Sequence, residues 1–309
     1  MTYNFKETMN KKERLAPGHR MCAGCGGTIA VRNVLRGLHE EDQAVICNAT
    51  CCLEVSTFMY PYTAWEDSFI HTAFACAGAT LSGVESAYKV LKKKGKVDEN
   101  YKFIAFGGDG GTYDIDLQSL SGAMERNHDL VYVCYDNGAY MNTGIQRSSA
   151  TPMFADTTTT PVGSKSNGKP QNRKDLASII ADHDVPYVAQ TTFIKNFKDL
   201  HTKSEKAIYT PGAAFLNVMA PCPRGWRYPA DKIMDVCKAA VETCYWPLFE
   251  VVEGEWILNY EPKKKLPVEE FLAMQGRFKH LFKPENEYLI EEFQKEVDRR
   301  WEALLKRCK

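Results

Sequence analysis

The feature that most limits the possible folds is an apolar run that leads directly into a glycine-rich turn. The run is YKFIAF at 101–106, and the turn is GGDGG at 107–111. A helix is predicted over 116–126, and a second apolar run, LVYVCY at 130–135, ends in Asp136 and Asn137. Strand, turn, helix and strand in this order indicate parallel strands joined by a crossover helix. Ligands bind at the carboxyl edge of such sheets.

The rest of the chain continues the alternation of strands and helices. Strands are predicted at 44–47, 187–190 and 213–219, and helices at 28–38, 70–91, 174–181, 193–209 and 231–243. Residues 151–173 form a long predicted loop, which indicates a functional or partly disordered segment. Two charged amphipathic helices are predicted at 268–278 and 284–307. We therefore expect an α/β fold, a mostly parallel sheet with helices on both faces, over residues 1–250, followed by a C-terminal helical extension over 251–309.

Charge and hydropathy exclude several classes of function. The chain has 39 Lys plus Arg and 39 Asp plus Glu, and this balance argues against a nucleic-acid partner. The longest uncharged stretch, 68–84, is too short and polar to cross a membrane. The N-terminal 15 residues carry six charged side chains and no apolar signal region, so we expect a cytoplasmic protein with no membrane partner.

The glycine turn and the end of the second strand together predict a metal–diphosphate site. Backbone N–H groups of a glycine-rich turn can approach phosphate oxygens closely. Asp109 and Asn137 place two hard oxygen ligands at neighbouring strand ends, and such ligands suit Mg²⁺ bridging a diphosphate. GDG followed 27 residues later by Asn in this context is the signature of thiamine diphosphate binding. A tight turn with a capping Asp is the structural alternative.

Eleven cysteines are unusual for a cytoplasmic chain and direct attention to metal or redox chemistry. Cys22 and Cys25 form a C-x-x-C pair before a predicted helix, while Cys51–Cys52 and Cys222 each follow a predicted strand. Four thiolates brought together by turns suit a 4Fe–4S cluster or zinc. Spacing alone also allows thioredoxin-like redox chemistry, and it does not decide between Cys51 and Cys52.

Segments throughout the chain resemble the beta subunits of 2-oxoacid:ferredoxin oxidoreductases, most of all the pyruvate:ferredoxin oxidoreductases. The similar segments are GHRMCAGCG, CNATCCLEV, TAWEDSFIHT, AFGGDGGTYDIDLQSLSGAMERNHD, YDNGAYMNTGIQRSSATP, PCPRGW, ETCYWPLFE and LAMQGRFKHL. The resemblance implies a thiamine-diphosphate-binding fold, with thiamine diphosphate, Mg²⁺ and one 4Fe–4S cluster as cofactors. It implies CoA-dependent oxidative decarboxylation of a 2-oxoacid, pyruvate first, with electrons passed to ferredoxin and a reaction that is reversible in principle.

The resemblance also assigns residues by position. It implies cluster ligands at Cys22, Cys25, Cys52 and Cys222, and Mg²⁺ ligands at Asp109, Asn137 and the carbonyl of Ala139. It implies cofactor contacts at Cys52, Gly108, Asp109, Gly110, Gly111, Asn137, Gly138, Ala139, Tyr140, Met141 and Asn142, and it places the Asn142 amide near the substrate as the catalytic candidate.

Two departures from the family pattern stand out. Cys51 replaces a usual Gly and could compete with Cys52 as a ligand. Gly138 replaces the Glu usual in pyruvate members, which puts the substrate in question.

Partners and alternative functions also follow from the resemblance. An alpha-type subunit is expected to complete the cofactor site, with gamma- and delta-type subunits, ferredoxin, coenzyme A and the 2-oxoacid as further partners. Alternative substrates are 2-oxoisovalerate, phenylglyoxylate, oxalate and 2-oxoglutarate. Alternative functions are an iron–sulfur electron-transfer subunit with a degenerate thiamine fold, and a zinc-stabilised binding module.

Overall fold

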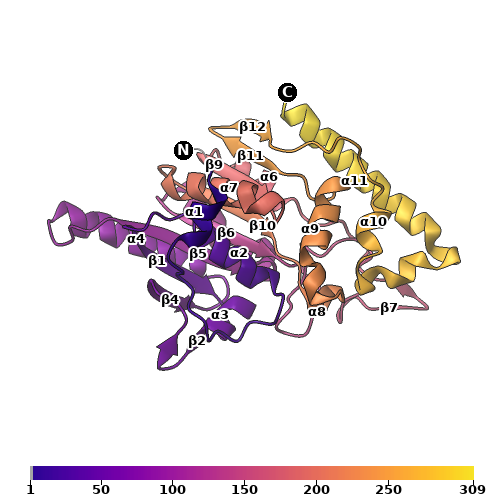
Figure 1. The fold of residues 1–309 in the computed structure, drawn as a ribbon, viewed down its shortest axis with the longest axis horizontal. Helices are drawn as coiled ribbons and strands as arrows, with labels where there is room; N and C mark the ends of the chain where they lie inside the picture. Colours follow the sequence, from indigo (N-terminus) through magenta and orange to yellow (C-terminus); the bar gives the residue numbers. More distant parts are fainter. Residues whose placement is uncertain (1–2) are drawn as a thin grey trace.

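An eight-stranded sheet forms the centre of the protein in the computed structural model, which describes residues 3–309. The strand order is β12-β11-β9-β10-β6-β5-β1-β4, and the six strands from β9 to β4 are parallel. They are β1 (Gln43–Ala49), β4 (Ser68–Thr72), β5 (Tyr101–Gly108), β6 (Val131–Asp136), β9 (Tyr187–Thr191) and β10 (Ala214–Met219). The predicted parallel sheet is confirmed (Figure 1).

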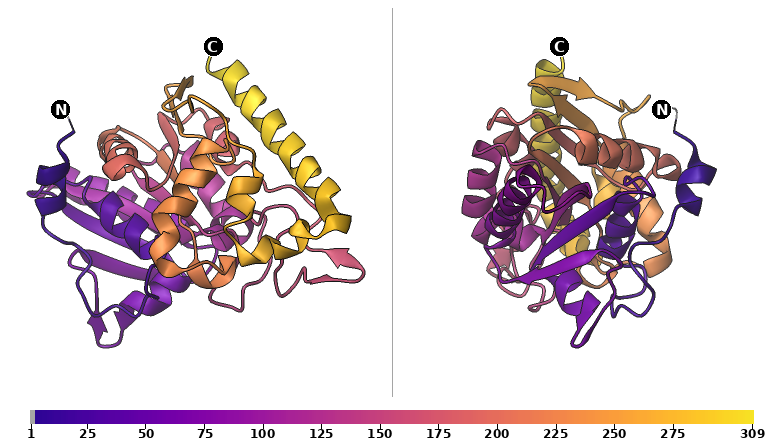
Figure 2. Two further views of the ribbon diagram at one scale, coloured as in Figure 1. Left: turned by 45° about the vertical axis from the view of Figure 1, so that its right-hand side comes forward. Right: turned by 90° about the vertical axis from the view of Figure 1, so that its left-hand side faces the viewer.

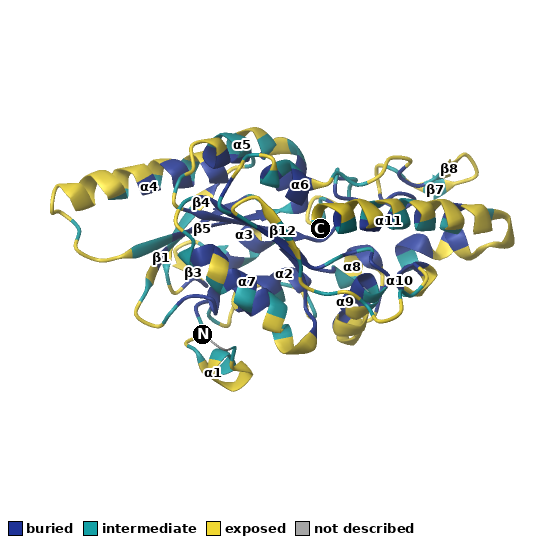
Figure 3. Cartoon of the chain, turned by 90° about the horizontal axis from the view of Figure 1, so that it is seen from above, coloured by how far each residue is buried: buried dark blue, intermediate teal, exposed yellow. Residues whose placement is uncertain are grey.

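Helices cover both faces of the sheet, as predicted (Figure 2). One face packs against α2 (Gly26–Leu35), α7 (Lys198–Tyr209) and α9 (Ile233–Glu242), and the other against α4 (Ala77–Lys93), α5 (Leu117–Glu125) and α6 (Leu176–Ala181). Alternation along β5 explains both layers, because Ile104 and Phe106 enter the first core while Phe103 and Ala105 enter the second. Both faces of the central strands are therefore buried (Figure 3).

The predicted helix over 70–91 is wrong at its beginning. Residues Ser68–Thr72 form β4, which pairs in parallel with β1, and the helix α4 starts only at Ala77. Ala75 adopts a left-handed backbone with φ of 68°, which separates the strand from the helix. Small and apolar residues in this stretch fit either element, so pairing with β1 decides its structure.

The sheet extends further along the chain than the sequence analysis predicted. The strands β11 (Phe249–Val252) and β12 (Glu255–Leu258) add an antiparallel hairpin beside β9. The predicted domain boundary after residue 250 falls within β11, and the division into two domains stays a prediction.

The C-terminal extension is helical, as predicted, but its first helix is short. α10 covers only Glu269–Leu272, and Gly276–Phe282 continues as a 3₁₀ helix. A further 3₁₀ turn, Pro284–Asn286, leads into the long helix α11 (Glu287–Arg307). Leu289, Phe293, Val297, Trp301 and Leu304 are the buried residues of α11, and their spacing places them on one side of the helix.

Shorter elements connect these layers. The chain between β5 and α5 forms a π-helical turn, Gly111–Ile115, and the predicted loop over 151–173 contains the small hairpin β7 (Val162–Gly163) and β8 (Ser166–Asn167). The remaining elements are α1 (Phe5–Asn10), α3 (Cys52–Thr57), the hairpin β2 (Phe58–Met59) and β3 (Tyr62–Thr63), α8 (Pro223–Trp226), and 3₁₀ turns at Lys195–Phe197 and Ala230–Lys232. None of the helices between residues 3 and 309 is long and apolar enough to span a membrane.

Truncating the buried aromatic side chain of Phe293 should weaken the packing of α11 against the core. Phe293 is 4% exposed and contacts Tyr245 and Phe278. Phe293→Ala should lower the free energy of unfolding by about 3–5 kcal/mol because it leaves a cavity. Chemical denaturation measures this effect. Phe282→Ala, at a side chain 40% exposed, should cost much less, and equal losses for both variants would contradict the assigned packing.

Candidate functional site

The glycine-rich turn lies at the carboxyl ends of β5 and β6, where it lines a small cavity of about 40 Å³. The cavity walls contain Thr50, Cys51, Cys52, Phe74, Gly108, Asp109, Gly110, Gly111, Tyr135, Asn137, Ala139, Tyr140, Met141, Asn142 and Thr143. All predicted cofactor-contact residues except Gly138 therefore surround one space. Gly110 is required sterically, because a Cβ at this position would overlap the Tyr140 ring.

Three oxygen ligands predicted for Mg²⁺ converge at this edge. The terminal amide atom of Asn137 lies 2.8 Å from Asp109 Oδ1 and 2.8 Å from the carbonyl oxygen of Ala139. If the amide nitrogen faces them, it donates to both. If the amide oxygen faces them, three oxygens lie side by side. Neighbouring ligands of an octahedral Mg²⁺ are about 2.9 Å apart, given Mg–O distances of about 2.0–2.1 Å. The residues present therefore fit this ion.

Asp109 is buried, and its hydrogen bonds compensate its negative charge only in part. It is 1% exposed, and it accepts hydrogen bonds from Ser148 Oγ at 2.6 Å and from the Asn137 N–H at 3.2 Å. Burial raises the pKa of Asp109 well above its ordinary value, and the nearby charge of Asp136 raises it further. A divalent cation at Asp109 would stabilise the ionised carboxylate.

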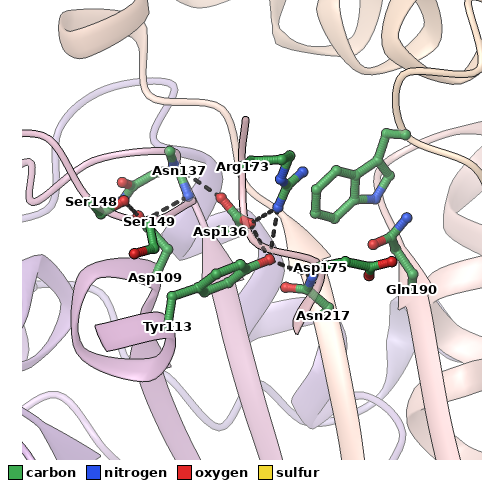
Figure 4. Close-up of polar contacts among 12 residues, drawn as sticks. Asp109, Tyr113, Asp136, Asn137, Ser148, Ser149, Arg173, Asp175, Gln190 and Asn217 are labelled. Atoms are coloured by element: carbon green, nitrogen blue, oxygen red, sulfur yellow. Dashed lines mark hydrogen bonds and ion pairs between the residues drawn. The ribbon is translucent and has the colours of Figure 1, made fainter. Parts of the chain in front are cut away.

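Asp136 anchors a polar network beneath the turn (Figure 4). Its carboxylate accepts hydrogen bonds from the Gly138 N–H at 3.0 Å and from Tyr113 Oη at 2.8 Å, and it forms an ion pair with Arg173. Asn217, on β10, donates to Tyr113 Oη at 2.8 Å. The network fixes the chain between Asp136 and Gly138, and thereby the direction in which Asn137 points.

Sequence reasoning missed Ser148 and Arg173 as contributors to this site. Both lie in the long segment between β6 and α6, and both reach the ends of the strands. Neither stands in a local pattern that indicates such a role. For Arg173 the one signal is the unusual length of the predicted loop over 151–173, and Ser148 lies before that loop.

Gly138 lies outside the cavity wall. Its backbone φ is 71°, and an added Cβ would lie 3.1 Å from Arg277 Nη1 and 3.7 Å from Trp226 Nε1. A longer side chain at this position would therefore meet Arg277, on the side away from the cavity. The replacement of Glu by Gly138 changes the surroundings of Arg277 more directly than it changes the space for a substrate.

The predicted cluster ligands come together from three parts of the chain. Besides burial, the nearby thiols of Cys25 and Cys222 raise the pKa of Cys52, and those of Cys25 and Cys22 raise the pKa of Cys222. Burial raises the pKa of the thiols of Cys25, Cys52 and Cys222, and these neighbouring thiols raise it further. Within residues 3–309, no three His, Cys, Asp or Glu side chains are arranged to hold a single metal ion. The cluster assignment stays a prediction.

The ends of helices make this set suitable for thiolates. Cys25 is the N-cap of α2; burial raises the pKa of its thiol, and hydrogen bonds from Thr28 and the Gly27 N–H offset part of that rise. Cys222 is the N-cap of α8, and its Sγ accepts from the Gly225 N–H at 3.4 Å. Backbone donors at helix N-termini stabilise the thiolate form that binds iron. The residues present thus fit an iron–sulfur cluster.

Cys51 and Cys52 have different surroundings. The Cys51 thiol donates to Asn48 Oδ1 at 3.5 Å, and burial raises its pKa to about 11. Burial also raises the pKa of Cys52, and the nearby thiols of Cys51, Cys25 and Cys222 raise it further. The assignment of Cys52 as the ligand stays a prediction from the resemblance.

Trp226 connects the cysteine set with the turn at Asn137. Its indole Nε1 donates to the carbonyl oxygen of Asn137 at 2.6 Å, and it is only four residues beyond Cys222. The sequence analysis did not give Trp226 this connecting role.

Lys169 attaches the long segment to the rim of the site. Its Nζ is buried and donates to the carbonyl oxygens of Thr151 at 2.6 Å, Ser149 at 3.3 Å and Asn172 at 3.4 Å. Burial lowers the pKa of Lys169 to about 7, and nearby Arg147 and Arg173 lower it further. The long segment is thus attached by a buried lysine whose positive charge is destabilised by burial and by two nearby arginines.

Stability should respond to pH through this lysine. The pKa of Lys169 is lowered from 10.5 to about 7 on folding. At pH values between these two, the unfolded chain therefore binds more protons than the folded protein does. The free energy of unfolding should therefore rise from pH 7 toward pH 10, by at most about 1.4 kcal/mol per unit. Lys169→Met should remove this contribution. Chemical denaturation of the wild type and of Lys169→Met from about pH 7 to about pH 10 measures this difference. Free energies of unfolding that change with pH in parallel in the two proteins would contradict the prediction.

Comparison with known proteins gives close relatives. Residues 48–218 match the family described as thiamine pyrophosphate enzyme, C-terminal TPP binding domain. The chain is 50% identical over 313 residues to pyruvate synthase subunit PorB of Thermotoga maritima, covering 99% of this chain and 96% of the relative. It is 49% identical over 296 residues to the subunit of that name from Methanocaldococcus jannaschii, covering 95% of this chain and 97% of the relative.

A second kind of subunit and a solved structure are also similar. Ketoisovalerate oxidoreductase subunit VorB of Pyrococcus horikoshii is 42% identical over 301 residues, covering 97% of this chain and 94% of the relative. The structure of 2-oxoglutarate:ferredoxin oxidoreductase from Magnetococcus marinus matches with a TM-score of 0.57 and 22% identity. That match covers 72% of this chain and 69% of the other, and it supports the fold.

Proposed function

Because the chain belongs to the thiamine pyrophosphate enzymes, and among them to the beta subunits of 2-oxoacid:ferredoxin oxidoreductases, we propose that it serves a pyruvate synthase. In this reaction the bond between the carboxylate and carbonyl carbons of pyruvate breaks and the acetyl group forms a thioester with coenzyme A. The products are acetyl-CoA, CO₂ and one proton, and ferredoxin takes up two electrons. In this proposal the chain holds the diphosphate end of the cofactor and one 4Fe–4S cluster.

The convergence of the Asp109 carboxylate, the Asn137 side-chain amide and the Ala139 carbonyl at the ends of β5 and β6 carries this proposal. Asp109, Asn137 and the carbonyl of Ala139 would bind Mg²⁺, and the N–H groups of the turn from Gly108 to Gly111 would face the diphosphate. A chain that had lost cofactor binding would have no need for a buried carboxylate of this kind. The retained oxygen set favours a catalytic subunit over a degenerate thiamine fold.

Thiamine diphosphate, when bound, would supply the carbon nucleophile and the electron sink for decarboxylation. The residues of this chain bind and orient it. Gly110 leaves room for the Tyr140 ring, and Ser148 holds the Asp109 carboxylate toward the metal position. Asn142 lies at the exposed rim of the cavity, where its amide could donate to a substrate oxygen.

The set Cys22, Cys25, Cys52 and Cys222 would hold the cluster, which accepts electrons one at a time. Every cysteine of the chain is a free thiol in the structure, and free thiols fit a reducing compartment. We therefore also propose a cytoplasmic location. A zinc site remains the competing assignment, and visible absorption that is lost on reduction distinguishes the cluster from zinc.

Pyruvate is favoured over other 2-oxoacids by the relatives. Two pyruvate synthase subunits are 49–50% identical to this chain, against 42% for the ketoisovalerate oxidoreductase subunit. Oxidation of a panel of 2-oxoacids with coenzyme A, by the complex purified anaerobically, tests this choice. A higher kcat/KM for 2-oxoisovalerate than for pyruvate would overturn it.

The chain alone should be inactive. Its cavity is small, and two of the lining residues, Asn142 and Thr143, are exposed, so a partner would be needed to enclose the cofactor. We expect no pyruvate oxidation by the isolated, reconstituted chain and full activity after an alpha-type subunit is added. Turnover by the chain without a partner would contradict the proposal.

The two cofactor sites should be separable by mutation. Asp109→Asn should weaken Mg²⁺–thiamine diphosphate binding by at least about tenfold and leave the iron content intact. Cys222→Ser should lower the iron content and leave diphosphate binding largely intact. Calorimetry and iron analysis measure the two effects.

Cys308→Ser, at a cysteine far along α11, serves as the control and should change neither property. Loss of both cofactors from both site variants would contradict two separate sites.

A further inference from the structure

Two buried hydrogen-bond donors near the cysteine set have no acceptor. Tyr228 is 6% exposed and Arg277 is 2% exposed. Within the described residues, 3–309, the Tyr228 hydroxyl and the Arg277 Nη2 are both buried without a hydrogen-bond partner. Buried polar groups in folded proteins nearly always have partners, so two orphans in one region indicate a missing acceptor.

Both groups lie within electrostatic reach of the predicted cluster ligands. Burial raises the pKa of Tyr228, and the thiols of Cys237, Cys222 and Cys25 raise it further. Burial lowers the pKa of Arg277 to about 10, against the opposing influence of Tyr245, Asp136 and Cys222. The Arg277 cation lowers the pKa of Tyr228 in turn, though less than burial raises it.

Rigid contacts fix both donors relative to Cys222. The Tyr228 N–H donates to the carbonyl oxygen of Pro223, the residue after Cys222, at 3.2 Å. The Arg277 guanidinium lies 3.9 Å from the centre of the Trp226 ring, and its Nε donates to Gln275 Oε1 at 3.0 Å. Since Trp226 and Pro223 both belong to α8, this short helix connects the ligand with the two donors.

The carboxylates near Arg277 are engaged elsewhere. Asp136 forms an ion pair with Arg173, and Asp109 accepts from Ser148 and faces the Mg²⁺ position. No salt bridge to Arg277 is found among residues 3–309. A buried guanidinium without a counter-ion is costly, which indicates that an anion completes this region in the working protein.

We propose that Tyr228 and Arg277 are the buried donor and cation that serve the sulfur atoms of the 4Fe–4S cluster and set its reduction potential. Hydrogen bonds to the sulfurs, nearby charge and solvent exposure are the means by which a protein tunes such a cluster. Reduction adds negative charge, which a cation and a donor stabilise, so both residues raise the potential. Both residues act on electron transfer through the reduction potential of the cluster and do not react themselves. The inference rests on the proposed function, since it requires that the cluster is present.

Redox titration of the full chain, reconstituted anaerobically with iron and sulfide and followed by electron paramagnetic resonance, tests the proposal. Arg277→Gln should lower the potential, with about a tenfold loss in the reduction equilibrium, or about 59 mV for one electron. Tyr228→Phe should lower it by a smaller amount, since it removes only a hydroxyl. Arg277→Lys keeps the cation and should retain most of the wild-type potential.

Tyr187→Phe is the matched control. Tyr187 is equally buried, but its hydroxyl donates to Glu250 at 2.8 Å, away from the cysteine set, and the potential should not change. Tyr228→Phe keeps the ring and its packing, so it remains informative if the Arg277 variants do not fold. A cluster whose potential is the same in wild type, Tyr228→Phe and Arg277→Gln would overturn this inference and leave the proposed function standing. A wild-type chain that takes up no iron would instead overturn the cluster itself.

Discussion

The burial of Asp109 is the constraint on which the site depends. A carboxylate that is 1% exposed cannot stay ionised without compensation, and Asp109 accepts hydrogen bonds from the Ser148 hydroxyl and the Asn137 backbone N–H. The neighbouring Asp136 carboxylate is paired with Arg173. Asp109 has no such ion pair among residues 3–309, and the side-chain amide of Asn137 and the carbonyl of Ala139 lie beside it, so a small divalent cation would suit this position.

Much of the fold could be predicted because its signals are local. The run before the glycine turn and the run before Asp136 are buried strands whose residues alternate between two cores, and apolar runs with turn residues between them show this directly. The errors have physical causes. Residues 68–76 carry apolar and small side chains that fit either element, and β11 and β12 are four-residue strands that depend on tertiary pairing, β11 with β9 and β12 with β11.

The residues of the site likewise differ in how far the sequence predicts them. Asp109 and Asn137 stand at predicted strand ends, so the sequence placed them together. The supporting residues do not follow such a rule. Ser148 and Arg173 come from one long segment between β6 and α6, while Arg277 comes from a 3₁₀ stretch near the C-terminus. Ser148 and Arg173 reach partners 39 and 37 residues away along the chain, and no periodicity or spacing reports such tertiary contacts.

The indole of Trp226 connects two segments that leave neighbouring strands. It donates to the carbonyl oxygen of Asn137 and lies against the Arg277 guanidinium, and the chain that carries it leaves β10 directly beside β6, with Met219 opposite Asp136. The segments that follow β6 and β10 are therefore joined by a side-chain bridge as well as by the hydrogen-bond ladder of the sheet, so a displacement of one would be transmitted to the other.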